Sequence, residues 1–368
     1  MKIALMGDIA AFGRYCLKND NTLFDYFDSV KKHLANFDLV IGNLEAPFVV
    51  NESAIGGKSA TISADPINIE LLNYMGFTHL NLANNHIGDY GHYGYERTKT
   101  LIENNDIDWF GTEDKQVRLS FKGEKISMSG FCSFNTNPSP VKSKSKLGLN
   151  YLDVNKVIDI IKNNADMGYF NILSVHSGQE HIHMPSSDDV KFARYLANRF
   201  NYVYYGHHPH VIQGFETVNK SAVFYSLGNF IFDDVFTSKD KEKPLISLSE
   251  SNKTGAIGEI EINNGVIKKS CITPIYLDKN RMLVGDEVKT AYQKKYDAYL
   301  KNFGSEEYSL DRSRAITSYI SGRKKMRDFK WYLSRLNLNS LQIIYKSRLN
   351  SFLYNKHFSS KLKTLEID

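Results

Sequence analysis

Apolar and polar positions follow two different spacing patterns along the first part of the chain. Short runs rich in Ile, Val, Leu and Tyr alternate with longer stretches whose apolar residues recur at helical spacing. The short runs predict buried strands, and the longer stretches predict amphipathic helices. Strands are expected at 2–7, 38–43, 78–83, 108–111, 117–131 with a hairpin turn at Lys122–Gly123, 170–176 and 202–207, and helices at 22–36, 66–75, 90–104, 153–164 and 187–200. This order is typical of an α/β protein with helices packed on a sheet.

The pattern changes twice in the second part of the chain. From about residue 211 to 276 strand-like runs dominate, and the simplest expectation is a second, more antiparallel sheet. Long helical patterns follow, at 286–303, 313–336 and 340–356. The sequence therefore predicts a domain over 1–284 and a basic helical extension over 285–368.

Charge is placed unevenly along the 368 residues, although the net charge is only +5. From Arg281 onward Lys and Arg number 18 against 9 Asp and Glu, whereas the preceding 280 residues carry 28 against 32. A basic tail of this kind is typical of a solvated helical face or of a segment that binds an acidic partner, such as an anionic lipid, a polyanionic polymer or nucleic acid. Both alternatives stay open at this point.

Neither a membrane span nor a disulfide framework is indicated. No run of 18 apolar residues occurs, and Gly7 and Asp8 break the apolar start, which favours a first strand over a signal peptide. Cys16, Cys132 and Cys271 have no C-x-x-C spacing, so a thiolate zinc site is not suggested. We expect a cytoplasmic protein, and the basic extension leaves open a peripheral contact with the membrane.

Polar residues that can bind metals collect where the predicted strands end. They are Asp8, Asn43, Glu45, Asn84, Asn85, His86, His176, His207, His208 and His210. In open α/β sheets ligands bind outside the carboxyl ends of the strands, so these five strand ends can converge on one crevice. Carboxylate, amide and imidazole groups together suit Mn²⁺, Zn²⁺ or Fe, and the absence of cysteine favours a catalytic over a structural site.

The segment GHHPHV, residues 206–211, places three histidines within five positions. His208 and His210 lie two residues apart, so on an extended segment both side chains face the same cleft, and Pro209 stiffens the turn. His207 then points elsewhere unless the loop curls. A lone histidine after a strand is more often structural, and the tripeptide 84–86 alone fits an Asx turn. Five such features in this order favour metal binding.

Six segments in order carry a resemblance to a known family. They are MGDIA, VIGNLEAPF, LNLANNHIGDYGHYGYERTKTLIENNDIDWFGT, VHSGQEH, YGHHPHVIQGFE and FYSLGNFIFDD, within roughly residues 1–277. Together they resemble the CapA family of bacterial capsule and poly-gamma-glutamate synthesis proteins, part of the calcineurin-like metallophosphoesterase superfamily. The resemblance implies a four-layer α-β-β-α sandwich of two mixed sheets. It also implies two divalent metals about 3.5–4 Å apart that activate a water molecule and polarise a phosphoryl oxygen.

Residue by residue, the resemblance implies a ligand set and one catalytic group. The implied metal ligands are Asp8, Glu45 in place of the bridging aspartate, Asn85, His176, His208 and His210. His176 and His208 would complete one metal, and His210 would join Asp8 on the other. His86 matches the neighbouring acid that protonates or stabilises the leaving group.

Further residues are candidates for contacts with the substrate. They are Arg14, Asn43, Asn84, Glu180, His207 and Asn229. Glu180 lies in GQEHIHMP with His181 and His183, where a supporting role, the binding of a substrate amine and an exposed loop all stay open. Gly228 and Asn229 suggest a tight turn near the site.

The sequence departs from the family pattern at two positions. The superfamily's opening Asp-x-His reads Asp8-Ile9-Ala10, so one metal site lacks its usual histidine and is expected to be weakly filled or empty. Ser177 stands where family members commonly carry Trp, which changes the expected wall of the substrate site.

Two functions from different classes remain. The first is a metal-dependent hydrolase of a phosphoester, amide or ester in capsule, polyglutamate or cell-surface polymer synthesis, acting on an anionic polymer or a phosphorylated substrate. The second is a non-catalytic accessory whose cleft binds a polymer or partner and whose basic C-terminal helices dock on a synthase complex or a membrane surface. A nucleic-acid enzyme ranks third, because no nucleic-acid-binding motif supports it.

Overall fold

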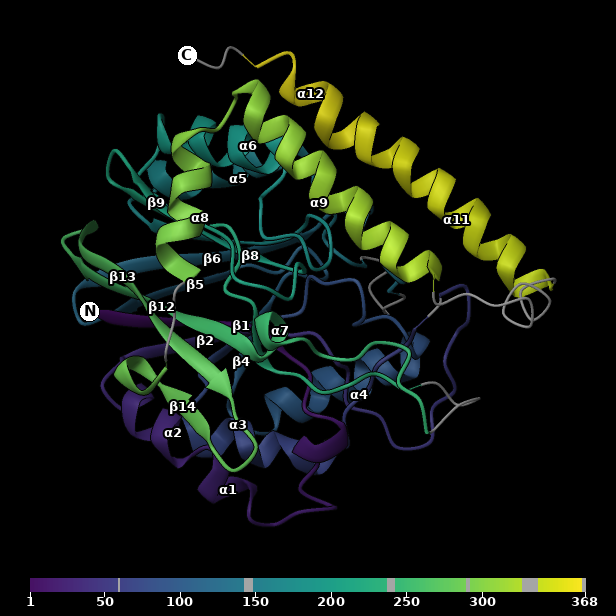
Figure 1. The fold of residues 1–368 in the computed structure, drawn as a ribbon. Coiled ribbons are helices and arrows are strands. Elements are labelled where there is room, and N and C mark those ends of the chain that lie inside the picture. The colour runs from purple at the N-terminus through teal and green to yellow at the C-terminus, as the bar shows by residue number, and fades with distance from the viewer. Residues whose placement is uncertain (59, 142–147, 237–241, 289–291, 326–336, 366–368) are drawn as a thin grey trace.

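Two β-sheets pack face to face, and helices cover both outer faces (Figure 1). The computed structural model describes residues 1–368 apart from 59, 142–147, 237–241, 289–291, 326–336 and 366–368. One apolar cluster lies between the sheets, and one lies under the helices on each outer face. The four-layer α-β-β-α sandwich implied by the resemblance is therefore confirmed.

The first sheet has the strand order β14-β13-β12-β1-β2-β3-β4, and β11 also pairs with β1. Its parallel part comprises β1 (Lys2–Ile9), β2 (Leu39–Leu44), β3 (His79–Asn81), β4 (Asp108–Phe110) and β11 (Asn229–Ile231). Its antiparallel part comprises β12 (Thr254–Asn263), β13 (Val266–Leu277) and β14 (Met282–Val284). The sheet is mixed, as expected.

The second sheet has the strand order β5-β6-β7-β8-β10-β9. Its strands are β5 (Val117–Phe121), β6 (Glu124–Cys132), β7 (Phe170–His176), β8 (Tyr202–His207), β9 (Phe215–Val218) and β10 (Ser221–Phe224). β5 and β6 form the predicted hairpin, where Lys122 and Gly123 both have positive φ, 50° and 81°. A two-residue turn of this kind matches the twist of the flanking strands.

Helices of the domain divide between the two outer faces. The first sheet is covered by α1 (Leu23–Tyr26), α2 (Asp28–Leu34), α3 (Ile69–Met75) and α4 (Gly91–Glu103). The second is covered by α5 (Val154–Asp166) and α6 (Ser187–Ala197). The short α7 (Glu250–Lys253) leads into β12. Single 3₁₀ turns occupy Gly13–Tyr15, Pro66–Asn68, Phe134–Thr136 and Gly285–Glu287.

Two expectations about these elements were wrong. The strands of 211–276 do not form a sheet of their own, because β9 and β10 join the second sheet whereas β11, β12 and β13 join the first. The predicted helix 22–36 is interrupted at Phe27, whose backbone leaves the helical region while its ring lies fully buried beside those of Tyr15 and Tyr26. Packing therefore overrides the helical periodicity there.

The C-terminal segment is mostly helical where the structure describes it. It contains α8 (Tyr292–Lys301), α9 (Glu306–Lys325), α11 (Leu338–Tyr354), a π-helical turn (Asn355–Ser359) and α12 (Ser360–Leu362). Of the predicted helices, 289–291 and 326–336 lie outside the described residues. Leu300, Phe358 and Leu362 belong to the same apolar cluster as α5 and α6, so the segment packs against the sandwich.

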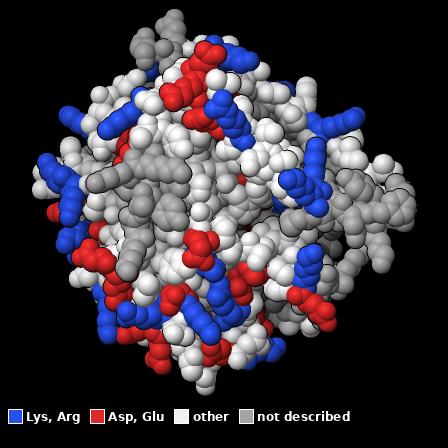
Figure 2. Space-filling view, in the orientation of Figure 1, with Lys and Arg blue, Asp and Glu red and all other residues white. Residues whose placement is uncertain are grey.

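Charges on the molecular surface are mixed on the face drawn in Figure 2, where basic and acidic side chains lie interspersed. The excess of Lys and Arg in the C-terminal segment therefore forms no single-sign field on that face. Among the helices that the structure describes, none has the length and apolarity needed to cross a bilayer.

Candidate metal centre

Strand registers bring the predicted ligands together at one end of the two sheets. In the first sheet Asp8 is the register partner of Asn43 on β2 and of Asn229 on β11. In the second sheet His176 at the end of β7 is the register partner of His207 at the end of β8. Asp8 Oδ1 lies 3.5 Å from His207 Nδ1, so the ends of the two sheets meet.

The backbone of the segment GHHPHV is tightly constrained. A Cβ atom at Gly206 would lie 2.1 Å from the carbonyl oxygen of Tyr225, so only glycine fits there. His208 and His210 both have positive φ, 94° and 56°. Such a conformation is uncommon for residues other than glycine and is typically found at functional sites. The loop therefore curls, which keeps His207 against Asp8 while His208 and His210 face the same cleft.

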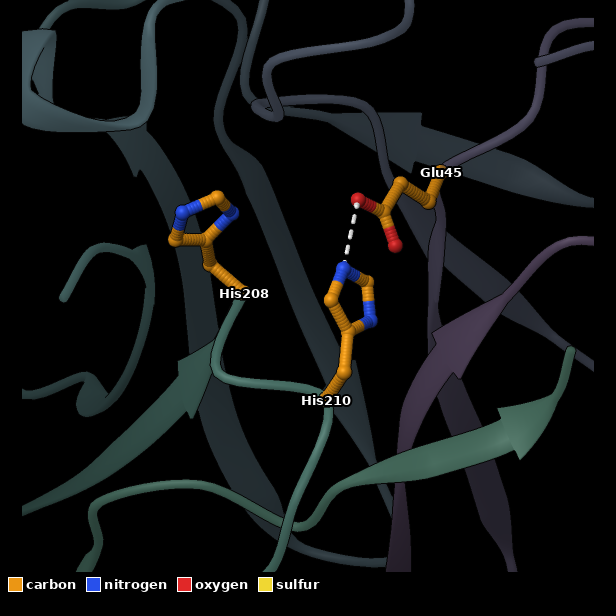
Figure 3. A group of neighbouring side chains, drawn as sticks. All are labelled: Glu45, His208 and His210. Carbon is orange, nitrogen blue, oxygen red and sulfur yellow. Dashed lines mark ion pairs between the residues drawn. The ribbon is translucent and has the colours of Figure 1, made fainter. Parts of the chain in front are cut away.

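Glu45, His208 and His210 form a compact buried cluster (Figure 3). One potential ligand atom from each of the three lies within 4.8 Å of the others. Glu45 Oε1 is 3.7 Å from His210 Nε2 and 3.8 Å from His176 Nε2. Asp8 Oδ2 is 3.3 Å from His210 Nδ1. The ends of four strands, β1, β2, β7 and β8, thus bring potential ligand atoms close together.

Several polar atoms of this cluster have no hydrogen-bond partner among the described residues. They include both carboxylate oxygens of Glu45 and Nδ1 of His208. Buried polar atoms are nearly always hydrogen-bonded in folded proteins, and leaving a carboxylate buried and unpaired is especially costly. A bound cation would satisfy these atoms, so the donor set fits a divalent metal.

The protonation states of the cluster also fit metal binding. Burial, followed by the neighbouring charge of Asp8, raises the pKa of Glu45 well above its usual value, because a negative charge here has no strong counter-charge. A divalent cation would supply this counter-charge. Burial lowers the pKa of His208 to about 3, and burial and neighbouring histidines lower that of His176 well below its usual value. Both imidazoles are therefore neutral near pH 7, with the free electron pair that ligation requires.

The remaining predicted ligands lie beside this cluster. Asn85 Oδ1 is 2.8 Å from His176 Nε2. Asp8 is fully buried, and burial acts to raise its pKa, but contacts with His207 and His210 outweigh burial and lower it. Ala10, at the position where the resemblance led us to expect a histidine, is buried and offers no side-chain ligand atom.

His86 is held by two charged residues that the sequence analysis did not single out. Its Nδ1 donates to Asp89 Oδ2 at 2.6 Å. Lys58 Nζ lies 2.9 Å from Asp89 Oδ1 and 3.1 Å from His86 Nδ1. Burial and then the Lys58 charge lower the pKa of His86, whereas Asp89 opposes them. The His-x-x-Asp spacing 86–89 was a detectable signal, but the contact with distant Lys58 was not.

A pocket of about 110 Å³ opens over the cluster. Its polar lining includes Lys58, Asn85, His86, Glu180, His181 and His210. Its apolar wall comes from Ala60, Ile62, Phe232, Val235, Leu245, Ile246 and Leu248. Of the six predicted substrate contacts, Glu180 lines this pocket. His181 lines it too, whereas His183 lies outside it and contacts the Ile212 carbonyl oxygen at 3.1 Å.

Three other predicted substrate contacts hold the cluster instead. Asn43 Nδ2 donates to Asp8 Oδ1 at 2.8 Å. Asn229 Oδ1 lies 2.9 Å from His210 Nδ1. His207, 1% exposed, contacts Ser174 Oγ at 3.1 Å through Nε2. These positions favour an orienting role over the substrate contact that the sequence suggested.

The last two candidates lie away from the pocket lining. Asn84 uses its side chain on the backbone, donating to the Leu44 carbonyl oxygen and accepting from the amides of His86 and Ile87. Arg14 pairs with Asp233 at 3.2 Å, and its side chain is 41% exposed. Although Arg14 is close to Asp8 in sequence, it does not line the pocket, because its side chain pairs with Asp233.

Comparisons with known proteins give a consistent picture. The model of the family described as "Bacterial capsule synthesis protein PGA_cap" matches residues 2–234. The capsule biosynthesis protein CapA of Bacillus anthracis is 29% identical over 324 residues, covering 82% of this chain and 77% of the relative. The PGA biosynthesis protein CapA of Bacillus subtilis is 26% identical over 291 residues, covering 76% and 74%.

Solved structures give weaker matches. NAD nucleotidase of Haemophilus influenzae aligns with a TM-score of 0.43 and 14% identity, over 89% of this chain and 60% of that one. The 5′-nucleotidase of Candida albicans aligns with a TM-score of 0.41 and 11% identity, over 88% and 58%. The chain thus spans about 60% of the length of these proteins.

Proposed function

Because the chain belongs to the family of bacterial capsule synthesis proteins whose model matches residues 2–234, we propose that it is a metal-dependent hydrolase of capsule, polyglutamate or cell-surface polymer synthesis. The bond cleaved is a phosphoester, or an amide or ester, of an anionic polymer or phosphorylated substrate. One observation carries the proposal: both oxygens of Glu45 are buried and without a hydrogen-bond partner among the described residues, beside His208 and His210.

Six side chains would hold one or two divalent ions, for which Mn, Zn and Fe are the candidates. They are Asp8, Glu45, Asn85, His176, His208 and His210. A bound ion would polarise an oxygen of the substrate and lower the pKa of a water molecule. Asn43 and Asn229 keep Asp8 and His210 in place through hydrogen-bond contacts, an arrangement that typically strengthens metal binding.

His86 is the proposed general acid-base group. Asp89 accepts from its Nδ1, which fixes the ring and leaves Nε2 to face a bound substrate. With a lowered pKa the ring is largely neutral at pH 7, so Nε2 can accept a proton and the nearby Asp89 carboxylate stabilises the resulting charge. Lys58, paired with Asp89, holds this carboxylate in turn.

A second function, a non-catalytic accessory whose cleft binds a polymer or partner, is favoured by one observation. Ala10 supplies no donor where the superfamily pattern has histidine. The cleft would then keep the polar residues of a hydrolase without its full ligand set. Metal content separates the two functions, because an accessory does not require a filled site.

The test is metal analysis of the protein purified without chelating resin, for the wild type and the His208→Ala and Glu45→Ala variants. We expect about one to two equivalents of Mn, Zn or Fe in the wild type and a loss of most of the metal in both variants. His33→Ala is the control, since this histidine pairs with Glu259 at 2.8 Å outside the cluster.

Wild-type protein that passes this test is then screened with aryl phosphomonoesters and phosphodiesters. Turnover that falls with metal content supports the hydrolase. Metal content far below one equivalent, unaffected by both substitutions, contradicts the hydrolase and leaves the binding protein.

A further inference from the structure

The helix α9 brings a guanidinium group to the pocket from outside the region that the family model matches. Arg323 lines the pocket together with His86, Glu180 and His210. Its Nη1 donates to the hydroxyl of Tyr319 at 3.2 Å. The Tyr319 ring lies 5.1 Å, centre to centre, from the imidazole of His181. A residue of the C-terminal segment thus stands directly beside the candidate active site.

Specific contacts hold α9 in this position. Arg312 donates from Nη2 to Gln179 Oε1 at 3.0 Å and from Nε to the Met184 carbonyl oxygen at 3.3 Å. Tyr308, 2% exposed, donates its hydroxyl to the Pro185 carbonyl oxygen at 2.5 Å. All three acceptors belong to the loop 179–185, which also carries Glu180 and His181. The helix and this wall of the pocket are therefore fixed to each other.

The helix α11 contacts one residue of the pocket lining and a neighbour of another. Asn350 Nδ2 donates to Oδ1 of the pocket residue Asn137 at 2.8 Å. Asn339 Oδ1 accepts from the backbone amide of Gly57 at 2.9 Å, next to Lys58. Both α9 and α11 are thus in contact with residues that line the pocket or lie next to that lining.

Charge pairing separates Arg323 from Lys58, the other Lys or Arg among the described residues that line the pocket. Lys58 is neutralised by Asp89 at 2.9 Å. Arg323 has no salt bridge to a carboxylate within the part of the chain that the structure describes. Glu180 lines the same pocket and interacts electrostatically with Arg323 without forming a salt bridge to it. Burial raises the pKa of Glu180, yet the histidines around it, with Arg323, outweigh burial and lower it to about 2.

We propose that Arg323 binds an oxyanion, a carboxylate or phosphate group carried by the substrate, and that α9 completes the substrate pocket while α11 supports residues at its edge. Guanidinium binds such groups through two parallel N–H donors, and only one Arg323 donor group is used within the described protein. The inference rests on the proposed function, since the pocket opens over the same metal cluster. It also changes the expected role of the basic extension from a docking tail to a wall of the site.

The test measures the binding of two probes, inorganic phosphate and glutarate, by titration calorimetry on the full chain with and without added Mn²⁺. The variants are Arg323→Ala and Arg323→Lys. Arg314→Ala is the matched control, because it removes an arginine of the same helix that pairs with Asp311 at 3.1 Å and is 75% exposed. Metal content and thermal unfolding are recorded for every protein.

We expect Arg323→Ala to weaken binding of at least one probe by about 10- to 100-fold. Arg323→Lys should restore part of the affinity, and Arg314→Ala should match the wild type. A loss restricted to phosphate identifies a phosphorylated substrate, and a loss restricted to glutarate identifies a carboxylate. Equal affinity of wild type and Arg323→Ala for both probes, or no binding of either probe by the wild type, overturns the inference.

The same measurements test this inference and the hydrolase proposal separately. Arg323 is not among the proposed metal ligands, so its substitution should leave metal content unchanged. A wild type that contains metal but whose anion binding ignores Arg323 contradicts the role of α9 alone. A wild type without metal that still binds glutarate through Arg323 contradicts the hydrolase alone.

Discussion

The strand-end cluster and the C-terminal helices contribute to the same pocket in opposite ways. Glu45 and Asp8 are fully buried and fixed by strands and by the curled segment GHHPHV. The helices α9 and α11 are largely exposed and reach the pocket through a few hydrogen bonds to loops. The strand-end cluster is thus a rigid region suited to the reaction, and the helices α9 and α11 form an attached region suited to recognition.

The two regions also differ in the free energy that they contribute to folding. The cluster holds unpaired buried polar atoms and two histidines with positive φ, and both features lower the stability of the metal-free protein. In contrast, several apolar side chains of α11 lie exposed to solvent, so they contribute little to the free energy of folding. They are Leu338, Leu341, Ile344, Tyr345 and Phe352. Substitutions in the cluster should therefore affect chemistry and stability strongly, and those on the outer helix faces weakly.

The largest expected effect is on the rate. His86→Ala removes the proposed proton-transfer group, so we expect turnover of any phosphoester that the wild type hydrolyses to fall by about 10²- to 10⁴-fold. Asp89→Asn should cause a smaller loss, because the ring stays but its orienting charge is removed. Metal content should remain that of the wild type in both variants. Unchanged turnover of His86→Ala would remove this residue from the mechanism.

The second effect concerns stability in the rigid region. Gly206→Ala places a Cβ 2.1 Å from the Tyr225 carbonyl oxygen, a backbone atom that cannot turn aside. We expect the free energy of unfolding to fall by about 1–3 kcal/mol or more. Thermal and urea unfolding measure it. An unfolding midpoint equal to that of the wild type would contradict the rigidity of the strand end before the three histidines.

The smallest expected effect is on the free energy of unfolding and comes from a substitution in α9, in the attached region. Gly322 lies inside α9 with no atom within 4 Å of an added Cβ. Gly322→Ala should raise the free energy of unfolding by about 0.5–1 kcal/mol, because alanine favours the helix. The same unfolding experiments apply. A decrease would show that this part of α9 is not a solvent-exposed helix, which would weaken the contrast between the two regions.

Much of the site could be predicted because its ligands follow strands with clear apolar runs. The predicted strands 170–176 and 202–207 match β7 and β8 residue for residue, so His176 and His207 were placed correctly at their ends. The position of each strand end depends on local sequence, and parallel pairing then brings the ends together.

The residues that sequence reasoning missed or misplaced depend on distant contacts. Lys58 reaches Asp89 across 31 positions, and Arg14 is held by Asp233 across 219. Arg323 reaches the pocket only because α9 docks on the loop 179–185. No periodicity or local motif encodes such pairings. The division of β9–β13 between the two sheets is unpredictable for the same reason.

The central place of β1 in the first sheet has a consequence for how the protein is made. This strand leaves the ribosome long before its neighbour β12, which begins only at Thr254. At roughly 5–20 residues per second, one edge of β1 waits for ten seconds or more without its partner. An unpaired strand edge is prone to aggregate. The nascent chain is thus more prone to aggregate than the finished protein, and ending translation near residue 234 would keep β11 beside Asp8 and Ile9 but leave residues 2–6 of that edge without β12.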